Sequence, residues 1–220
     1  DNGSYILVNS DNSYVTSGYT SSFGNGGLDG YLQKIDKNGI LQWSKAIGGP
    51  GNDYFNKVKQ TIDGGYIAVG STRSFGGSST GVAWMVKTDA SGNMLWSRKF
   101  DDGNPNGSIG WDIATTADGG YALSGTNRIA GGLANAMVIK TDNNGNVQWA
   151  KSFESVSTDE SLGIIEDADS LVVIANQLGQ SASLYNGVIM KLNGSNGAVI
   201  WAKDYDIESK ANRPSAIFKT

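Results

Sequence analysis

The twelve residues KTDNNGNVQWAK at positions 140–151 recur, altered but readable, three more times along the chain. When the copies are aligned on their tryptophan, Trp43, Trp96, Trp149 and Trp201 lie at spacings of 53, 53 and 52 residues. Self-similarity at one fixed period of this size is typical of repeat architectures. We therefore expect four repeats within a single domain, over residues 1–49, 50–102, 103–154 and 155–205.

Each repeat divides into four short segments that suit the strands of one antiparallel sheet. In the second repeat Asp63-Gly64 separates two apolar segments, and Asp-Gly in that place is the strongest short-range signal of a β-hairpin. The expected strands are 5–10, 14–20, 31–35 and 40–47 in the first repeat; 56–61, 66–72, 83–88 and 93–100 in the second; 110–115, 121–126, 136–141 and 146–153 in the third; and 162–166, 171–176, 187–192 and 198–205 in the fourth.

Glycine occupies two repeated positions. One ends the turn before each tryptophan strand, where a positive φ is needed, at Gly39, Gly92, Gly145 and Gly197. At the other position a small residue lies inside the second strand, at Gly18, Gly70, Gly125 and Ala175. Such a residue indicates either close packing of a bulky side chain, here the repeated tryptophan, or a simple bulge.

The third and fourth strands of the repeats, such as residues 137–139 and 199–201, are apolar on both faces. This pattern predicts sheets that are covered on both sides. Four-stranded sheets of this kind bury those faces by stacking around an axis. The sequence therefore predicts an all-β fold, a four-bladed β-propeller of ~53-residue repeats.

Composition excludes several classes of function. The 220 residues include no Cys and no His, which rules out disulfides, thiolate metal sites and a Ser-His-Asp triad. The net charge of −4, without a basic cluster, argues against a nucleic-acid partner. No apolar run approaches the length of a membrane span. We expect no catalytic residues, no cofactor and no membrane insertion.

The pattern Asp-Gly-Gly-Tyr-x-x-x-Gly-x-Thr at 63–72, followed by Lys-x-Asp-x-x-Gly-x-x-x-Trp at 87–96, resembles the repeats of secreted bacterial and archaeal β-propeller proteins. Its Asp-x-x-Gly-x-x-x-Trp part is similar to the tryptophan motif of quinoprotein-like (PQQ-type) propellers. The resemblance covers nearly all of the chain and implies an extracellular location, secreted or on the cell surface. Quinoprotein enzymes have eight blades and ligands for cofactor and calcium that this sequence does not show, so only the structural motif carries over.

A C-terminal extension, residues 206–220, follows the last repeat. Its last five residues align with residues 57–61, the first strand of the second repeat. They correspond to the first strand of a further repeat that does not continue, and they are Ala216, Ile217, Phe218, Lys219 and Thr220. Three roles fit this surplus strand. It closes its own ring, or it pairs with a neighbouring subunit to give an oligomer or filament, or it begins further blades of a longer propeller.

Three sets of polar residues could carry chemistry. Turns that suit half of a calcium loop begin at Asp36, Asp89 and Asp142, but no distal carboxylate completes the loop, so we favour plain turns. One lysine lies in each third strand, at Lys34, Lys87, Lys140 and Lys191; we expect its charged end in water rather than in a basic funnel. Neighbouring acids are interpreted as solvated loop residues rather than a glycosidase pair, at Asp101-Asp102, Asp159-Glu160 and Asp204/Asp206/Glu208.

Four aromatic residues stand out from the repeated tryptophan. Phe23 and Phe75 occupy matching Ser-Phe-Gly loops and could stack on sugar rings, although their repetition favours a structural plug. Trp84 is expected in the core. Trp111 breaks the repeat pattern, and non-repeating residues are where a specific function would lie.

The sequence thus predicts a non-catalytic extracellular structural module that self-associates through its C-terminal strand. The alternative is a lectin-like or adhesion propeller whose partner is a cell-surface glycan or protein. A fragment of a larger propeller enzyme fits less well.

Overall fold

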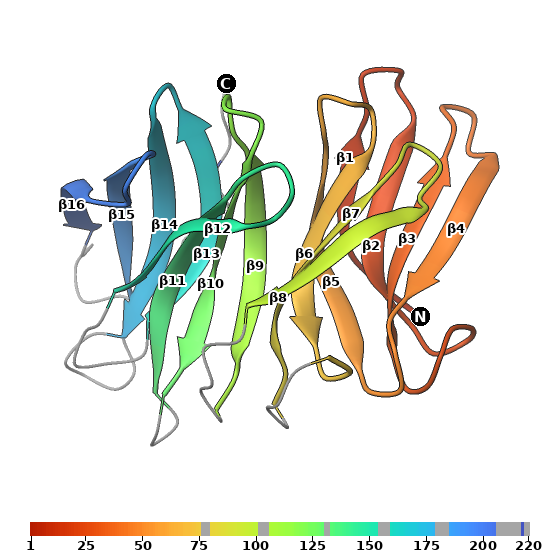
Figure 1. Ribbon diagram of the computed structural model, residues 1–220, viewed down its shortest axis with the longest axis horizontal. Coiled ribbons are helices and arrows are strands. Elements are labelled where there is room, and N and C mark those ends of the chain that lie inside the picture. Colours follow the sequence, from red (N-terminus) through yellow and green to blue (C-terminus); the bar gives the residue numbers. More distant parts are fainter. Residues whose placement is uncertain are drawn as a thin grey trace. The chain divides into compact units, whose positions relative to one another are not determined.

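The computed structural model has four four-stranded antiparallel sheets, one for each expected repeat (Figure 1). It describes residues 1–75, 80–100, 106–129, 133–153, 159–178, 185–205 and 217. In every sheet, here called a blade, the strands are hydrogen-bonded in the order in which the chain makes them. None of the described ranges forms a helix that could cross a membrane.

All sixteen expected strands are present. Blade 1 contains β1 (Asn2–Val8), β2 (Tyr14–Thr20), β3 (Asp29–Ile35) and β4 (Leu41–Ile47). Blade 2 contains β5 (Asp53–Gln60), β6 (Tyr66–Thr72), β7 (Val82–Thr88) and β8 (Met94–Phe100). Blade 3 contains β9 (Ser108–Thr115), β10 (Tyr121–Arg128), β11 (Ala134–Thr141) and β12 (Val147–Phe153). Blade 4 contains β13 (Asp159–Asp167), β14 (Ser170–Leu178), β15 (Tyr185–Asn193) and β16 (Val199–Tyr205).

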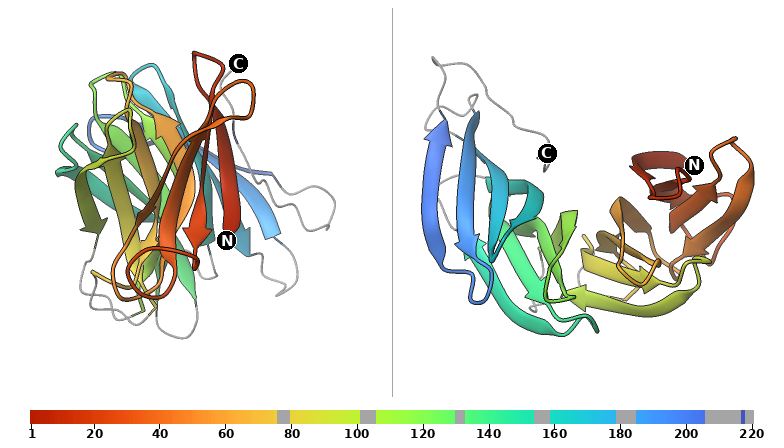
Figure 2. Two further views of the ribbon diagram at one scale, coloured as in Figure 1. Left: turned by 90° about the vertical axis from the view of Figure 1, so that its right-hand side faces the viewer. Right: turned by 90° about the horizontal axis from the view of Figure 1, so that it is seen from above.

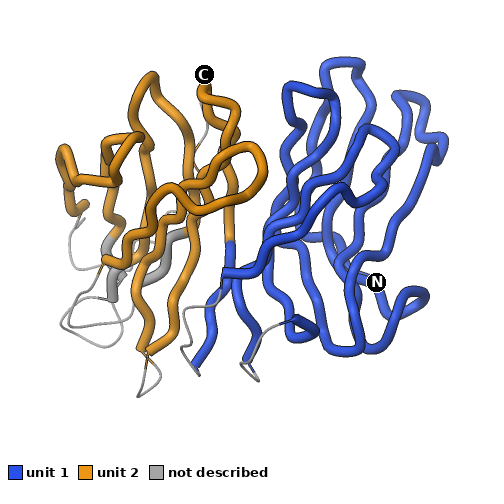
Figure 3. Tube along the Cα trace, in the orientation of Figure 1, with its two compact units in different colours: residues 1–110 blue, residues 111–220 orange. Residues whose placement is uncertain are grey.

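The chain divides into two compact units, residues 1–110 and 111–220, which are described separately (Figure 3). Unit 1 holds blades 1 and 2, together with the first three residues of β9, and unit 2 holds the rest of blade 3 and blade 4. Within each unit one sheet packs on the next, as Figure 2 shows from two sides. Apolar side chains fill the space between them, for example Leu32 of blade 1 with Phe55 and Trp84 of blade 2.

Burial differs between the third and fourth strands of a blade. Every residue of β7 and β11 is buried, so the prediction of sheets covered on both sides is confirmed there. For the fourth strands it is wrong, because β8 and β12 are largely exposed and β16 is exposed throughout. The fourth strand forms the edge of each sheet and has only one neighbouring strand in it.

The small residue inside the second strand makes room for backbone. A Cβ on Gly18 would overlap the carbonyl oxygen of Asn2, and one on Gly70 would overlap that of Tyr54. The first strand is irregular beside each of these glycines, since the pairing register shifts between residues 3 and 5 and between residues 55 and 57. The bulge interpretation is therefore confirmed, and the interpretation that a tryptophan packs there is wrong.

Candidate functional site

The repeated tryptophan joins one blade to the next within each unit. In unit 1 the indole Nε1 of Trp43 donates to Ala90 O at 3.2 Å, and a Cβ on Gly92 would lie 2.9 Å from Trp43 Cε3. In unit 2 Trp149 Nε1 donates to the carbonyl of Gly194 at 2.9 Å. Its ring likewise covers the turn glycine of the following blade, where a Cβ would lie 2.7 Å from Trp149 Cε3. Trp43 and Trp149 thus each lie on the tryptophan-motif turn of the following blade.

The remaining members of the motif have different surroundings. Trp96 is half-buried in β8, and the Arg98 guanidinium lies 5.5 Å from its ring. Gly145 has the expected positive φ of 77°. Trp201 is 38% exposed, and a Cβ on Gly39 would meet nothing within 4 Å among the described residues.

The repeated lysine is paired within its own blade. Lys87 Nζ lies 2.9 Å from an Asp63 carboxylate oxygen, and Lys140 Nζ lies 2.7 Å from Asp118 Oδ2. Both lysines are buried, so the expectation of charged ends in water is wrong for them. The same pairing occurs at 3.5 Å from Lys34 to Asp11 and at 2.8 Å from Lys191 to Asp167. The lysine therefore ties the third strand to the first hairpin turn of its blade.

Hydrogen bonding lowers the pKa of the paired carboxylates. Partial burial raises the pKa of Asp63, but hydrogen bonds from Thr61, Lys87 and the Gly65 N–H outweigh it and bring the pKa to about 2. The same balance applies to Asp118, where Lys140 and others lower the pKa to about 2. Both groups are ionised at neutral pH.

The Asp-x-x-Gly turns use their carboxylates locally. Asp36 Oδ1 accepts the N–H groups of Asn38 and Ile40 at 2.8 and 2.9 Å. Asp89 and Asp142 accept the corresponding turn N–H groups and also an asparagine side-chain amide. Glycine follows with φ between 76° and 82° in these three turns. These hydrogen bonds and positive φ angles are those of plain turns. In the part of the chain that the structure describes, no three acidic side chains are grouped to hold a metal.

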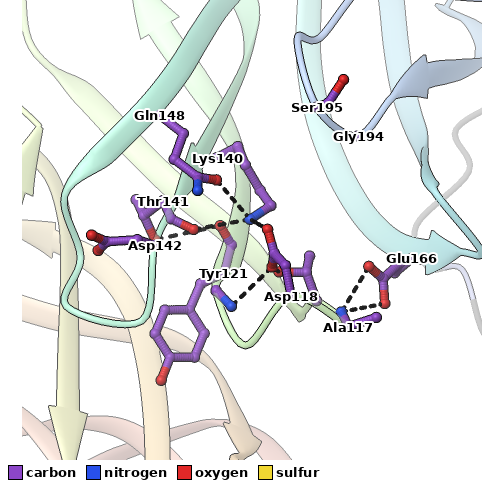
Figure 4. A network of polar contacts seen from close by, with 12 residues as sticks. Ala117, Asp118, Tyr121, Lys140, Thr141, Asp142, Gln148, Glu166, Gly194 and Ser195 are labelled. Carbon is purple, nitrogen blue, oxygen red and sulfur yellow. Dashed lines mark hydrogen bonds and ion pairs between the residues drawn. The ribbon is translucent and has the colours of Figure 1, made fainter.

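A cavity of about 470 Å³ lies in unit 2 at the hairpin turns of blades 3 and 4. Lys140 Nζ lies at its wall and donates to Asp118 Oδ2, Thr141 O and Gln148 Oε1 at 2.7 to 3.0 Å (Figure 4). Glu166 of blade 4 accepts the Ala117 N–H through both oxygens at 2.9 Å. The remaining lining comes mainly from the turns of blade 4, namely Asp169, Ser170, Leu171, Asn193, Gly194 and Ser195, with Thr116 of blade 3.

In unit 1 a tyrosine occupies the position that corresponds to Leu171. Tyr66 is fully buried, its ring meets Trp43 edge-on at 5.8 Å, and its hydroxyl accepts a hydrogen bond from Asn9 Nδ2 at 3.2 Å. Burial lowers the pKa of Lys34, but a hydrogen bond with Tyr66 and the Asp11 charge outweigh it, and the net pKa is raised. Tyr66 therefore fills the space between Trp43 and Lys34. Leu171 is shorter and has no hydroxyl, so the corresponding space in unit 2 is open.

Both hairpin turns of blade 4 also depart from the repeat. Only Ala168 and Asp169 separate β13 from β14, and Ala168 has a φ of 52°, a left-handed conformation where the second and third repeats use glycine. Between Lys191 and Trp201 the chain has one residue more than between Lys140 and Trp149. These altered turns carry the lining residues of blade 4. The cavity therefore lies where the fourth repeat differs most from the others.

The structure places the other sequence candidates as follows. Trp84 is buried and stacks on Phe55 at 4.9 Å, which confirms a core role. Trp111 is half-buried and donates to Thr126 Oγ1 at 2.9 Å. Phe23 and Phe75 are 46% and 45% exposed and lean on Tyr31 and Trp84, so the plug and sugar-stacking interpretations both stay open.

Several candidates lie outside what the structure describes. Asp204 is exposed, whereas nothing is described of the side chains of Asp101, Asp102, Asp159, Glu160, Asp206 and Glu208. The surplus strand also falls outside, except for Ile217. A Cβ on Gly163 of β13 would lie 3.0 Å from Ile217 Cγ2, so this residue lies against its own chain.

No protein-family model matches the sequence, and no curated protein sequence matches it. Among solved structures, the chain is similar to BamB from Moraxella catarrhalis, with 15% identity and a TM-score of 0.54 over 94% of this chain and 50% of that one. It is similar to a thermostable family-43 glycoside hydrolase, with 14% identity and a TM-score of 0.53 over 96% of this chain and 74% of that one. A quinohemoprotein alcohol dehydrogenase from Pseudomonas putida HK5 matches with 9% identity and a TM-score of 0.52, over 96% of this chain and 41% of that one.

These likenesses show the fold. The four sheets are blades of a β-propeller, as the repeat predicted. The chain spans half of the BamB chain and less than half of the dehydrogenase chain.

Sequence reasoning did not find the cavity. Its lining residues lie in or beside turns, and none of them belongs to a motif that is typical of binding. Two signals were visible in the fourth repeat, since Leu171 stands where the other repeats have Tyr14, Tyr66 and Tyr121, and the turn before Ala198 has an extra residue. The sequence signals of the cavity are therefore the positions at which the fourth repeat departs from the other three.

Proposed function

We propose that this chain is a non-catalytic binding module that works outside the cell and takes a neutral or amino-bearing glycan in the cavity of unit 2. The observation that carries the proposal is the cavity itself, which combines polar groups with apolar surface and lies where the fourth repeat diverges. Its volume of about 470 Å³ falls in the range of small-ligand sites.

The lining chemistry favours hydroxyl groups over anions. Carboxylates, amides and hydroxyls of Asp169, Asn193 and Ser195 can donate to or accept from the vicinal hydroxyls of a sugar. Lys140 already donates to three acceptors, so it offers little to a carboxylate or phosphate. Three carboxylates, Asp118, Glu166 and Asp169, further disfavour a negatively charged ligand.

The same groups support binding rather than hydrolysis. A glycosidase needs one carboxylic acid that stays protonated at its working pH. Asp118 has its pKa lowered to about 2 and is paired with Lys140, and Glu166 accepts a backbone N–H. With Asp118 held as an ionised acceptor, the site is suited to recognise hydroxyls without breaking a glycosidic bond.

A glycan array tests the proposal, with wild type compared to Leu171→Tyr, which copies the side chain that fills the equivalent space in unit 1. We expect the wild type to bind neutral or amino sugars and not sialylated ones, and the variant to lose these signals. An array without wild-type binding, or equal binding by the variant, would contradict it.

A second candidate, self-association, is favoured by the outer members of the tryptophan motif. Trp43 and Trp149 each cover the turn of a following blade, whereas Trp201 is 38% exposed and the Gly39 turn has open space in the described part of the chain. We propose that Trp201 of one copy docks on the Gly39 turn of a second copy, a head-to-tail contact. Light scattering of wild type and Trp201→Ala tests this; an assembly that survives the substitution, or a monomeric wild type, would overturn it.

A further inference from the structure

Two buried carboxylates meet in unit 1. Asp29 begins β3 and Asp53 begins β5, and their residues are only 2% and 0% exposed. Both side chains point to the backbone of Gly48, where a Cβ would overlap Asp29 Oδ1 and would lie 2.6 Å from Asp53 Oδ2. One oxygen from each carboxylate therefore converges on the same point.

Asp53 accepts hydrogen bonds through both of its carboxylate oxygens. Its Oδ1 accepts from the Thr72 hydroxyl and from the N–H groups of Arg73 and Ser74 at up to 3.4 Å. Its Oδ2 accepts from the Gly49 N–H at 2.8 Å and from Ser74 Oγ at 2.6 Å. Five hydrogen bonds therefore satisfy the Asp53 carboxylate.

Asp29 is left without such compensation. Its Oδ2 accepts the Asn25 N–H at 2.8 Å, but its buried Oδ1 has no hydrogen-bond partner among the described residues. Neither Asp29 nor Asp53 has an ion pair with lysine or arginine in the same part of the chain. A buried, unpaired carboxylate oxygen beside a second carboxylate is costly unless a positive charge joins it.

Comparison of the blades shows that Asp29 is an addition to the repeat. The network around Asp53 has a counterpart in blade 1, where Asp1 Oδ1 accepts from Thr20 Oγ1 and Ser22 Oγ. Asp29 pairs with Thr20 in the sheet, and the corresponding partner of Thr72 is the apolar Val82. The fold therefore builds this corner of a blade without a second carboxylate, and Asp29 needs another explanation.

We propose that Asp29 and Asp53 hold a calcium ion beside Gly48. Calcium takes carboxylate, amide and backbone carbonyl oxygens in flexible geometry, so two carboxylates suffice when loop carbonyls and water complete the shell. Gly24 lies against the Asp29 carboxylate, Gly48 lies against both carboxylates, and the Gly49 N–H donates to Asp53, so the backbone approaches the two acids closely. The site is separate from the Asp-x-x-Gly turns, whose carboxylates are occupied by turn N–H groups.

Calcium binding to the full-length chain tests this, by equilibrium dialysis after chelator treatment and by thermal unfolding with and without calcium. We expect one calcium per wild-type chain and a rise of several degrees in Tm at millimolar calcium, because a ligand of the folded state stabilises it. Asp29→Asn should bind none and show no shift. Asp36→Asn, which changes an exposed turn carboxylate, should behave as wild type.

The main competing account is a proton shared between the two acids. Asparagine imitates a protonated Asp29, because its NH₂ group can donate to Asp53 Oδ2. A wild type that binds no calcium, with the same Tm in calcium and in chelator, would overturn the proposal, as would calcium binding that persists in Asp29→Asn. If Asp29→Asn fails to fold, the wild-type dialysis result alone decides.

Discussion

The same junction between consecutive blades occurs once in each unit, and the two copies differ at one key side chain. In unit 1 Tyr66 lies against Trp43 and reaches Asn9 with its hydroxyl. In unit 2 Leu171 takes that position, and a cavity remains beside Lys140. The repeat thus builds a closed, structural junction by default. The proposed binding site lies where the fourth repeat lacks this tyrosine and where its hairpin turns differ.

The largest expected effect comes from opening the closed junction. Tyr66→Leu should lower the free energy of unfolding by roughly 2–4 kcal/mol, because it removes a fully buried ring and a hydrogen bond. The reverse change, Leu171→Tyr, should cost less than about 1 kcal/mol, since the cavity offers room for the ring. Urea unfolding of both variants gives the comparison. Equal losses would mean that the cavity of unit 2 does not offer the space that Tyr66 fills in unit 1.

The tryptophan–turn contact is shared by both junctions and should respond alike in each. Gly92→Ala and Gly197→Ala should each cost about 2 kcal/mol, because an added methyl strains a positive φ and presses on the indole of the preceding blade. Gly39→Ala has the strain without the contact and should cost about 1 kcal/mol. Thermal unfolding of the three variants separates the backbone strain from the contact with the indole. Three equal losses would show that the contact does not contribute to stability.

Acid should weaken both units in the same pH range. The folded pKa values of Asp63 and Asp118, about 2, lie below the ordinary value of 3.8, so their stabilisation is present above pH 4 and is lost as the pH falls towards 2. Both carboxylates are about half exposed, and solvent screening limits each contribution to about 1 kcal/mol. Urea unfolding at pH 6, 4 and 2.5 should show a smaller acid loss in Asp63→Asn/Asp118→Asn than in wild type.

The smallest expected effect concerns the altered turn of blade 4. Ala168→Gly should raise the free energy of unfolding by about 0.5–1 kcal/mol, because glycine adopts a positive φ without steric strain. The same substitution at Ala198, outside the positive-φ residues, should not stabilise. Stabilisation by both changes would show that the effect does not come from the turn conformation.

The repetition made the fold predictable, because four copies of one pattern repeat the same hairpin and tryptophan signals. The partner of each tryptophan was not predictable, since a period places a residue along the chain but does not say that Trp43 covers the turn of blade 2. The burial of Lys87 and Lys140 was also not predictable from the sequence, because lysine is usually solvated and its aspartate partner lies 22 to 24 residues earlier. The cavity was not predictable because it forms where Leu171 replaces a tyrosine and where the turns of blade 4 differ from the repeat.

Isothermal titration with a glycan that the array identifies tests most directly whether the open junction is the binding site. Leu171→Tyr is compared with Leu95→Tyr, the same substitution at a position of β8 that is 58% exposed. We expect Leu171→Tyr to weaken binding at least about tenfold, which is about 1.4 kcal/mol, while Leu95→Tyr binds as wild type. Unchanged affinity in a folded Leu171→Tyr protein would contradict the account.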